Sequence, residues 1–177
     1  MNAQKKVVPT FRFDGYKNYW NISNLDKITN RVTRKNSNLE SERPLTISAQ
    51  HGLIDQREYF EKQIASRDTS GYYLIKKDEF AYNKSYSKGY PLGAIKRLDK
   101  YEDGVLSTLY IVFKPMDFMD SAFLASYYDT SCWYKEVGMY AAEGARNHGL
   151  LNISPVDFFK TRVIYPEIEE QTQIGNF

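Results

Sequence analysis

Short apolar segments with a period of two, set between polar turns, constrain the fold of this chain more than any other sequence feature. Alternation of this kind predicts β-strands with one buried face. The clearest segment is GVLSTLYIVFKP, residues 104–115, which predicts one strand with Leu109, Ile111 and Phe113 on the inward face and Tyr110 and Val112 on the other. Further segments of this kind lie at residues 45–50, 72–75, 80–82 and 91–98. Together they predict a curved, mostly antiparallel sheet.

The hydrophobic period lengthens after Pro115, which predicts helices. Apolar residues at helical spacing mark one face over 116–127 and another over 133–141, with YDTS between them. Ser154 before Pro155 predicts a short capped turn. We also expect a short helix over 25–32 and a strand over KTRVIYP, residues 160–166. Strands followed by helices define an α+β fold with short helices flanking the sheet.

Length and composition limit the kind of protein. A chain of 177 residues fits one domain with a packed core. No apolar run reaches the roughly 18 to 20 residues that a membrane span needs, and the N-terminal segment lacks the apolar stretch of a secretory signal. A cytoplasmic protein without a membrane partner is therefore expected. With one cysteine and two histidines, the chain is poor material for a structural zinc site, and we expect no metal.

Residues that carry chemistry are sparse. The sequence contains no G-x-x-x-x-G-K, G-x-G-x-x-G, H-E-x-x-H or G-x-S-x-G motif. Cys132 with His51 or His148 could form a nucleophile pair. A thiol beside Trp133 in a predicted helix is, however, expected to be a small buried side chain. The sequence therefore argues against catalysis and a cofactor, although a site assembled in space can escape a linear search.

Two pairs of adjacent carboxylates are interpreted as solvated surface rather than as catalytic acids and bases. They are Asp78–Glu79 and Glu169–Glu170, and each pair lies in a charged context. We expect all four side chains to face water.

Positive charge gathers between Lys76 and Lys100, although the net charge of the whole chain is only +2. Seven basic residues in this segment accompany three acidic ones, an excess that would suit a phosphate-facing patch. A solvated face of lysines would give the same pattern. The basic residues are Lys76, Lys77, Lys84, Lys88, Lys96, Arg97 and Lys100.

Several segments, taken in order, resemble one half of the specificity subunit of type I restriction-modification enzymes. The resemblance begins with VPTFRFDGYKNYW and TISAQHGLIDQREYF, and continues through YYLIKKDEFAYNKSYSKGYPLGAIKR and GVLSTLYIVFKP. It ends with ISPVDFFKTRVIYPEIEEQTQI, in which P-x-x-E-E-Q-x-x-I is typical of the junction between a target-recognition domain and a spacer helix. The segments cover most of the chain.

The resemblance implies a non-catalytic DNA-specificity subunit whose partners are double-stranded DNA, DNA methyltransferase (modification) subunits and a restriction/translocase subunit. A full subunit of this family holds two target-recognition domains, each of which reads one half of a bipartite site. Residues 1–166 would form one such domain, and 167–177 the start of the spacer helix. Because that helix stops near its first turn, we expect a fragment of a longer chain or a natural half-length form.

The resemblance directs attention to SAQHG, residues 48–52. Gln50 can pair in bidentate fashion with adenine, His51 can donate or accept at guanine or phosphate, and Gly52 lets the backbone approach a groove. Leu45, Ile47 and Ala49 would form the buried face of the supporting strand. A turn whose polar residues satisfy their own backbone remains an alternative.

The second candidate segment is the loop YNKSYSKGYPLG, in which we expect Tyr82 inside and Lys84 to Lys88 outside. With the basic segment, this gives a predicted set of DNA-binding residues: Gln50, His51, Lys76, Lys84, Ser85, Ser87, Lys88, Lys96 and Arg97. Three other functions remain open. They are the recognition domain of a fused type II restriction-methyltransferase, a small hydrolase using Cys132 and His51, and a protein-interaction scaffold.

Overall fold

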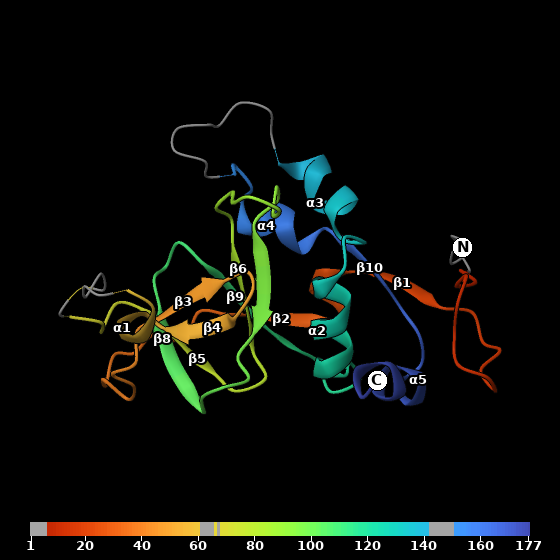
Figure 1. The fold of residues 1–177 in the computed structure, drawn as a ribbon, viewed down its shortest axis with the longest axis horizontal. Coiled ribbons are helices and arrows are strands. Elements are labelled where there is room, and N and C mark those ends of the chain that lie inside the picture. Colours follow the sequence, from red (N-terminus) through yellow and green to blue (C-terminus); the bar gives the residue numbers. More distant parts are fainter. Residues whose placement is uncertain (1–6, 61–65, 67, 142–150) are drawn as a thin grey trace. The chain divides into compact units, whose positions relative to one another are not determined.

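Short antiparallel strands dominate the computed structural model, which describes residues 7–60, 66, 68–141 and 151–177 (Figure 1). The described residues fall into two compact units. The first comprises those of Met1–Asn30, Pro115–Tyr140 and Ser154–Phe177, and the second those of Arg31–Lys114 and Ala141–Ile153. The combination of strands and short helices confirms the α+β prediction. No helix in the described part of the chain is long and apolar enough to cross a membrane.

The second unit contains most of the strands. β3 (Leu45–Ser48) and β4 (Gly52–Asp55) form an antiparallel hairpin, and α1 (Gln56–Tyr59) follows it directly. β5 (Tyr73–Lys76) pairs with β8 (Asp103–Leu106), also antiparallel. A four-stranded sheet has the order β2–β9–β6–β7. Its strands are β2 (Thr29–Val32), β6 (Phe80–Asn83), β7 (Ala94–Arg97) and β9 (Ile111–Pro115).

A cluster of apolar side chains forms the core of the second unit, and Ile47, Tyr101 and Tyr110 pack against it while partly buried. Its buried members come from every strand pair of the unit: Val32, Leu45, Leu53, Tyr73, Ile75, Ala81, Leu98, Leu106 and Val112. Phe80 and Phe113 are also fully buried. The predicted strands at 72–75, 80–82 and 91–98 are confirmed by β5, β6 and β7.

Among the described residues, the first unit is built on one strand pair, one 3₁₀ helix and four α-helices. β1 (Asn21–Asn24) pairs antiparallel with β10 (Arg162–Tyr165), and the 3₁₀ helix η1 (Leu25–Lys27) follows β1. The α-helices are α2 (Ser121–Asp129), α3 (Tyr134–Tyr140), α4 (Pro155–Phe159) and α5 (Ile168–Gly175). Each lies where a helix was predicted, although Met116 and Met119 precede α2 instead of joining its face.

Local sequence explains where these helices begin. Asp120 caps α2 by accepting a hydrogen bond from the Phe123 backbone N–H at 2.9 Å. Ser154 caps α4 in the same way through the Asp157 N–H at 3.0 Å, with Pro155 in the first turn as predicted. Between α2 and α3, Thr130 ends the first helix as its C-cap.

Polar contacts fasten α5 within the first unit. The guanidinium of Arg12 binds both carboxylate oxygens of Glu170, whose side chain is only 2% exposed. The Gln171 side chain accepts from the Asp120 N–H at 2.8 Å and donates to the Pro166 carbonyl at 2.9 Å. These contacts use two neighbouring residues of α5 for structural support.

Both carboxylate pairs depart from the sequence prediction in the same way. Glu169 and Asp78 are exposed as expected, but Glu170 and Glu79 are buried. Glu79 accepts from the Arg34 guanidinium at 2.8 Å and from the Lys76 backbone N–H at 2.9 Å. A carboxylate loses its hydration when it is buried. Each of these two carboxylates instead accepts hydrogen bonds from the protein and pairs with an arginine.

Two element predictions were wrong. The expected helix over 25–32 is one turn of η1 followed by β2, because the β-branched residues Thr29 and Val32 suit a paired strand. The expected single strand over 104–115 is β8, a turn, and β9. The Tyr110 N–H closes this turn on the Ser107 carbonyl at 3.1 Å and leaves Leu109 68% exposed.

Cys132 also differs from its prediction. It is exposed, and it lies in the turn before α3. Its backbone N–H donates to the Thr130 hydroxyl at 3.1 Å. Cys132 belongs to the first unit and His51 to the second, while His148 lies outside the described residues.

Candidate nucleic-acid interface

The turn of the β3–β4 hairpin presents Gln50 and His51 to solvent. The two strands pair from Leu45 opposite Asp55 to Ser48 opposite Gly52, and residues 49–51 form the connecting turn. Gln50 and His51 are both exposed. Gly52 has φ of +78°, a conformation that glycine adopts without strain, so it can end this three-residue turn.

The strand that supports this turn is shorter than predicted, and its buried residues differ. β3 ends at Ser48 instead of continuing to Gln50. Leu45 is fully buried as expected, but Ser48 is also buried and Ala49 belongs to the turn. The hydroxyl of Ser48 accepts from the His51 backbone N–H at 3.2 Å. Ser48 is therefore a structural residue that closes the turn.

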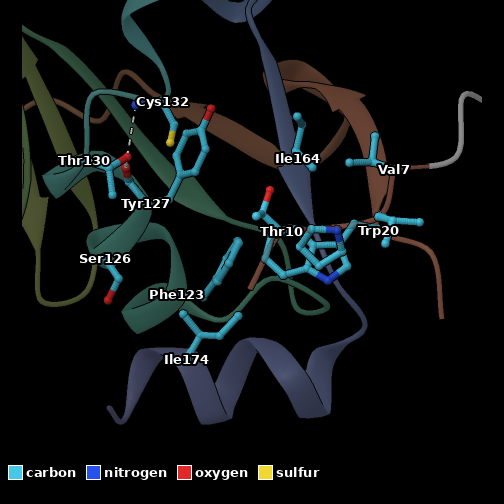
Figure 2. A pocket seen from close by; sticks show the side chains of 12 residues that line it. Val7, Thr10, Trp20, Phe123, Ser126, Tyr127, Thr130, Cys132, Ile164 and Ile174 are labelled. Carbon is cyan, nitrogen blue, oxygen red and sulfur yellow. Dashed lines mark hydrogen bonds between the residues drawn. The ribbon is translucent and has the colours of Figure 1, made fainter. Parts of the chain in front are cut away.

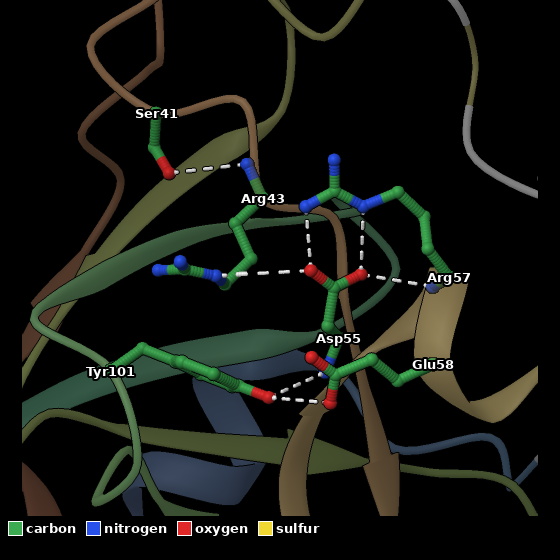
Figure 3. A network of polar contacts seen from close by, with 6 residues as sticks. All are labelled: Ser41, Arg43, Asp55, Arg57, Glu58 and Tyr101. Carbon is green, nitrogen blue, oxygen red and sulfur yellow. Dashed lines mark hydrogen bonds and ion pairs between the residues drawn. The ribbon is translucent and has the colours of Figure 1, made fainter.

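At the other end of the hairpin, the Asp55 carboxylate is the centre of a polar network (Figure 3). Asp55 is 3% exposed. Its Oδ1 accepts from the Arg57 Nε at 3.0 Å and from the Arg57 backbone N–H at 2.9 Å, and its Oδ2 accepts from Nη2 at 2.6 Å. The side-chain hydrogen bonds from Arg57 lower the pKa of Asp55 below 3.8, against the opposing effect of burial.

Arg43 and Tyr101 complete this network. The Arg43 Nε lies 3.8 Å from Asp55 Oδ2, and its guanidinium stacks over the Tyr101 ring at 4.4 Å. The Tyr101 hydroxyl accepts from the Asp55 N–H at 3.3 Å and donates to Glu58 at 3.2 Å. Figure 3 shows how the arginines reach the carboxylate from different sides.

Backbone contacts anchor the hairpin base further. The Gln56 N–H donates to the Pro44 carbonyl at 2.7 Å, and its side chain donates to the Leu45 carbonyl at 3.0 Å. The Val105 N–H donates to the Arg43 carbonyl at 2.8 Å, which joins the hairpin to β8. The base is thus fixed to the core of the second unit, while the turn extends from it.

The loop between β6 and β7 is the second candidate, and its backbone is ordered by its own hydrogen bonds. The Asn83 side chain accepts from the Ser85 N–H at 3.0 Å, and Ser87 and Tyr90 exchange two backbone hydrogen bonds of 3.3 and 2.8 Å. Gly89 has φ of +84° within this turn. Ser85, Ser87 and Lys88 are exposed, whereas Tyr82 is fully buried, as predicted.

Lys84 differs from the rest of this loop because its amine is engaged. It is partly buried, and its Nζ donates to the Ile153 carbonyl at 3.3 Å, while its own carbonyl accepts from the Leu151 N–H at 3.0 Å. Burial lowers the pKa of Lys84 below 10.5. These contacts give Lys84 a structural role within the second unit.

The basic residues of 76–100 do not form one patch along β6 and β7. Phe80 pairs with Arg97 at one end of these strands, and Asn83 pairs with Ala94 at the end that leads into the loop. Lys84 and Lys88 therefore belong to the loop end, and Arg97 to the opposite end. There, Arg97 contacts Asp99 at 2.6 Å and Asp78 at 3.8 Å.

Acidic partners offset more of the charge at this opposite end, where Lys77 contacts Glu102 at 2.9 Å. Lys76 is exposed in β5, and Lys96 is partly buried in β7 opposite Ala81. All nine predicted residues lie within the second unit. At the loop end, neither Lys84 nor Lys88 forms an ion pair with a carboxylate of the described residues.

The polar network at the hairpin base was missed by the sequence analysis. A usable signal was present in DQRE, residues 55–58, because an aspartate followed three residues later by glutamate is typical of a helix N-terminus. Asp55 is indeed the N-cap of α1. No sequence signal indicated that Arg43 and Tyr101 would join it, since these residues lie 12 and 46 positions away in the chain.

Comparisons with solved structures identify the fold. The crystal structure of the HsdS subunit from Thermoanaerobacter tengcongensis is similar to this chain, with a TM-score of 0.60 and 16% identity over 89% of this chain and 40% of that chain. A chain from a study of complex assembly and conformational transition of the type I R-M system has a TM-score of 0.59 and 16% identity, over 94% and 42%. No protein-family model and no curated protein matches.

These likenesses confirm the predicted fold. At 16% identity they show a shared fold. This chain spans about two-fifths of the length of each of the two similar chains.

Proposed function

We propose that this chain recognises one half of a bipartite DNA site and thereby directs adenine methylation and restriction by partner subunits of a type I restriction-modification system. The fold shared with HsdS over 89% of this chain carries the proposal. The covered share of that subunit, 40%, suits one recognition domain of a protein that holds two. The described residues form two compact units, and these units do not separate at residue 166. We therefore keep the recognition domain at 1–166 and the start of the spacer helix at 167–177 as a proposal.

The β3–β4 hairpin is the proposed reading element. The major groove of B-DNA admits a two-stranded β-ribbon, and base edges there present a pattern that distinguishes all four base pairs. Gln50 offers an amide that can pair with adenine, and His51 offers a ring nitrogen for guanine or phosphate. Because the Asp55 network fixes the hairpin base, the turn would enter the groove in a defined register.

The β6–β7 loop is the proposed backbone contact. Ser85, Ser87 and Lys88 are exposed on a turn with an ordered backbone, so few degrees of freedom are lost when they meet phosphates. Lys84 is a weaker candidate because its amine already serves the Ile153 carbonyl. Lys76, Lys96 and Arg97 would contribute to the surrounding field more than to direct contacts.

The chain would act without catalysis of its own. Methyl transfer and cleavage would belong to partner methyltransferase and restriction/translocase subunits in the cytoplasm, and this chain would supply the DNA sequence preference. The buried carboxylates support this division, since Glu79 and Glu170 each serve an ion pair with an arginine.

A selection from a randomised duplex library, followed by fluorescence anisotropy at one salt concentration, tests the proposal. We expect the full chain to enrich a short motif and to bind it on the order of 10³-fold more tightly than unrelated duplex. Affinity for all duplexes should fall as salt rises. Equal affinity for every sequence would contradict specific recognition, and an affinity independent of salt would contradict phosphate contacts.

A further inference from the structure

A pocket of about 540 Å³ in the first unit offers no partner to a DNA phosphate (Figure 2). Its lining includes Phe123 from α2, Ile164 from β10 and Ile174 from α5, and none of its described lining residues is acidic, basic or a histidine. A phosphate would lose its hydration there without gaining a positive partner. The exposed Lys88 lies instead in the β6–β7 loop of the second unit, so the way in which that loop is held bears directly on phosphate binding.

Lys84 fastens the start of this loop through two separate groups. Its backbone carbonyl accepts from the Leu151 N–H at 3.0 Å, and its Nζ donates to the Ile153 carbonyl at 3.3 Å. Lys84 is partly buried and Ile153 is 2% exposed. Both partners belong to the second unit, as Lys84 does. One side chain and one peptide group thus tie the loop to a segment that lies far away in the sequence.

The returning arm of the loop is fixed as well. The Tyr82 hydroxyl donates to the Leu92 carbonyl at 2.9 Å. Gly93 has φ of +77°, and a Cβ at this position would overlap the Asn83 carbonyl oxygen, so the two arms approach as closely as glycine allows. Asn83 pairs with Ala94 at this end of the hairpin. The exposed residues of the loop therefore extend from a base that is held on both arms.

We propose that Lys84 is a positioning residue, which holds Ser85, Ser87 and Lys88 in the arrangement that meets DNA phosphates and makes no phosphate contact of its own. This role rests on the proposed DNA-recognition function. A protein binds its ligand more weakly in proportion as its binding-competent arrangement is less populated. Loss of the Lys84 amine should therefore reduce the fraction of chains in which the loop is in place, and weaken binding to every duplex alike.

Amide hydrogen exchange of the full chain tests the loop attachment without DNA. Lys84→Met removes the amine and keeps an unbranched side chain of similar length. We expect the N–H groups of Leu151 and Ser85 to exchange about 2- to 10-fold faster, because one hydrogen bond of the attachment is lost. Lys88→Met is the matched control, since it makes the same charge change at an exposed residue of the same loop and should leave both rates unchanged. Melting curves establish that both variants are folded at the temperature of measurement.

Anisotropy titrations at several salt concentrations supply the second arm, with the selected duplex and an unrelated one. Lys84→Met should weaken binding to both duplexes about 2- to 10-fold at an unchanged log-log salt slope, because no phosphate contact is lost. Lys88→Met should instead lower the magnitude of that slope by about 0.9. Each variant thus changes a quantity that the other leaves constant.

Three results would overturn the positioning role. They are unchanged exchange rates in Lys84→Met, faster exchange with unchanged DNA affinity, and a slope lowered by about 0.9, which would make Lys84 itself a phosphate contact. In the wild type, the Leu151 N–H should stay protected when DNA binds, and faster exchange in the complex would count against the proposal in the same way. A chain that bound no DNA would contradict the proposed function, and with it this role. The exchange rates without DNA distinguish that failure from a loop that Lys84 does not hold.

Discussion

Phe80 and Phe113 occupy directly paired positions on β6 and β9, and their rings stack with centroids 5.3 Å apart and planes 14° from parallel. Both side chains are fully buried. This pair therefore joins the middle strands of the four-stranded sheet through side chains as well as through the backbone.

Phe113→Ala should lower the free energy of unfolding by about 3 to 5 kcal/mol, because it removes one ring of the stack and leaves a cavity. Leu109→Ala is the matched control, since Leu109 is 68% exposed in the preceding turn and should change stability by no more than about 0.5 kcal/mol. Urea unfolding measures both. Equal losses in the two variants would mean that the turn at 107–110 is misplaced.

Gln50→Ala and His51→Ala should each reduce discrimination between the selected half-site and single-substituted duplexes by about 1 to 3 kcal/mol. Nonspecific affinity and thermal stability should hardly change, because both side chains are exposed. Anisotropy titrations at fixed salt, beside melting curves, give the measurement. A uniform loss on all duplexes would make these residues phosphate contacts, and a lower melting temperature with intact discrimination would make the turn purely structural.

Lys88→Ala should weaken binding to all duplexes and lower the log-log salt slope by about 0.9, the value for one phosphate contact. Lys84→Ala should change that slope less and destabilise the fold more, because the Lys84 amine donates to the Ile153 carbonyl. Binding constants measured at several salt concentrations give one slope for each variant, and comparison of the two slopes shows which lysine contacts phosphate. If the Lys84 variant showed the larger change in slope, its amine would have to leave Ile153 to meet DNA.

Asp55→Asn should lower the free energy of unfolding at neutral pH by roughly 1 to 2 kcal/mol, since it weakens charge-assisted hydrogen bonds to Arg57, which is about half exposed. The pKa of Asp55 is lowered in the folded chain, so its contribution is present above about pH 3.8 and is lost as the pH falls through the folded pKa. The difference between wild type and variant should therefore shrink on acidification. A difference that stayed constant from pH 7 to pH 2 would contradict an ionised Asp55.

Arg12→Ala should destabilise the first unit by about 3 kcal/mol, because it leaves the buried Glu170 carboxylate without its positive partner. Glu169→Ala is the control, as Glu169 is the exposed neighbour on α5. Replacing Arg12 and Glu170 together with apolar residues of similar volume should recover most of the loss. Double-mutant unfolding curves test this, and no recovery would show that Arg12 stabilises the unit through other contacts.

Sequence periodicity predicted the elements whose signals lie within a few residues of one another. Capped helices such as α2 and α4 carry their start signals within a few residues, and β5 to β7 show apolar runs bounded by turn residues. The wrong predictions concern elements whose structure depends on pairing with a strand far away in the sequence. Val32 fits either a helical or an extended period, and its place in β2 depends on β9, which is about 80 residues away.

The candidate site likewise has parts that could be predicted from the sequence and parts that could not. The exposed hairpin turn at Gln50 and His51 follows from a strand that ends in polar residues and glycine. The burial of Glu79 and Glu170 could not be predicted, because a carboxylate beside another carboxylate looks solvated until Arg34 and Arg12 are placed against it. Likewise, the charge of 76–100 was read as one patch, whereas the pairing of Phe80 with Arg97 puts the basic residues at two ends of a hairpin.

The asymmetry of the β3–β4 hairpin has a consequence for how a recognition chain could change its target. The stabilising contacts of the hairpin described above come from its base, from Ser48 and from the core residues Leu45, Ile47 and Leu53, and none uses the side chain of Gln50 or His51. Mutations at these two positions would thus be almost neutral for folding. Under the proposed DNA-recognition role, single substitutions at these positions would change the DNA preference while the scaffold that carries the turn is preserved, so target specificity and stability would evolve independently.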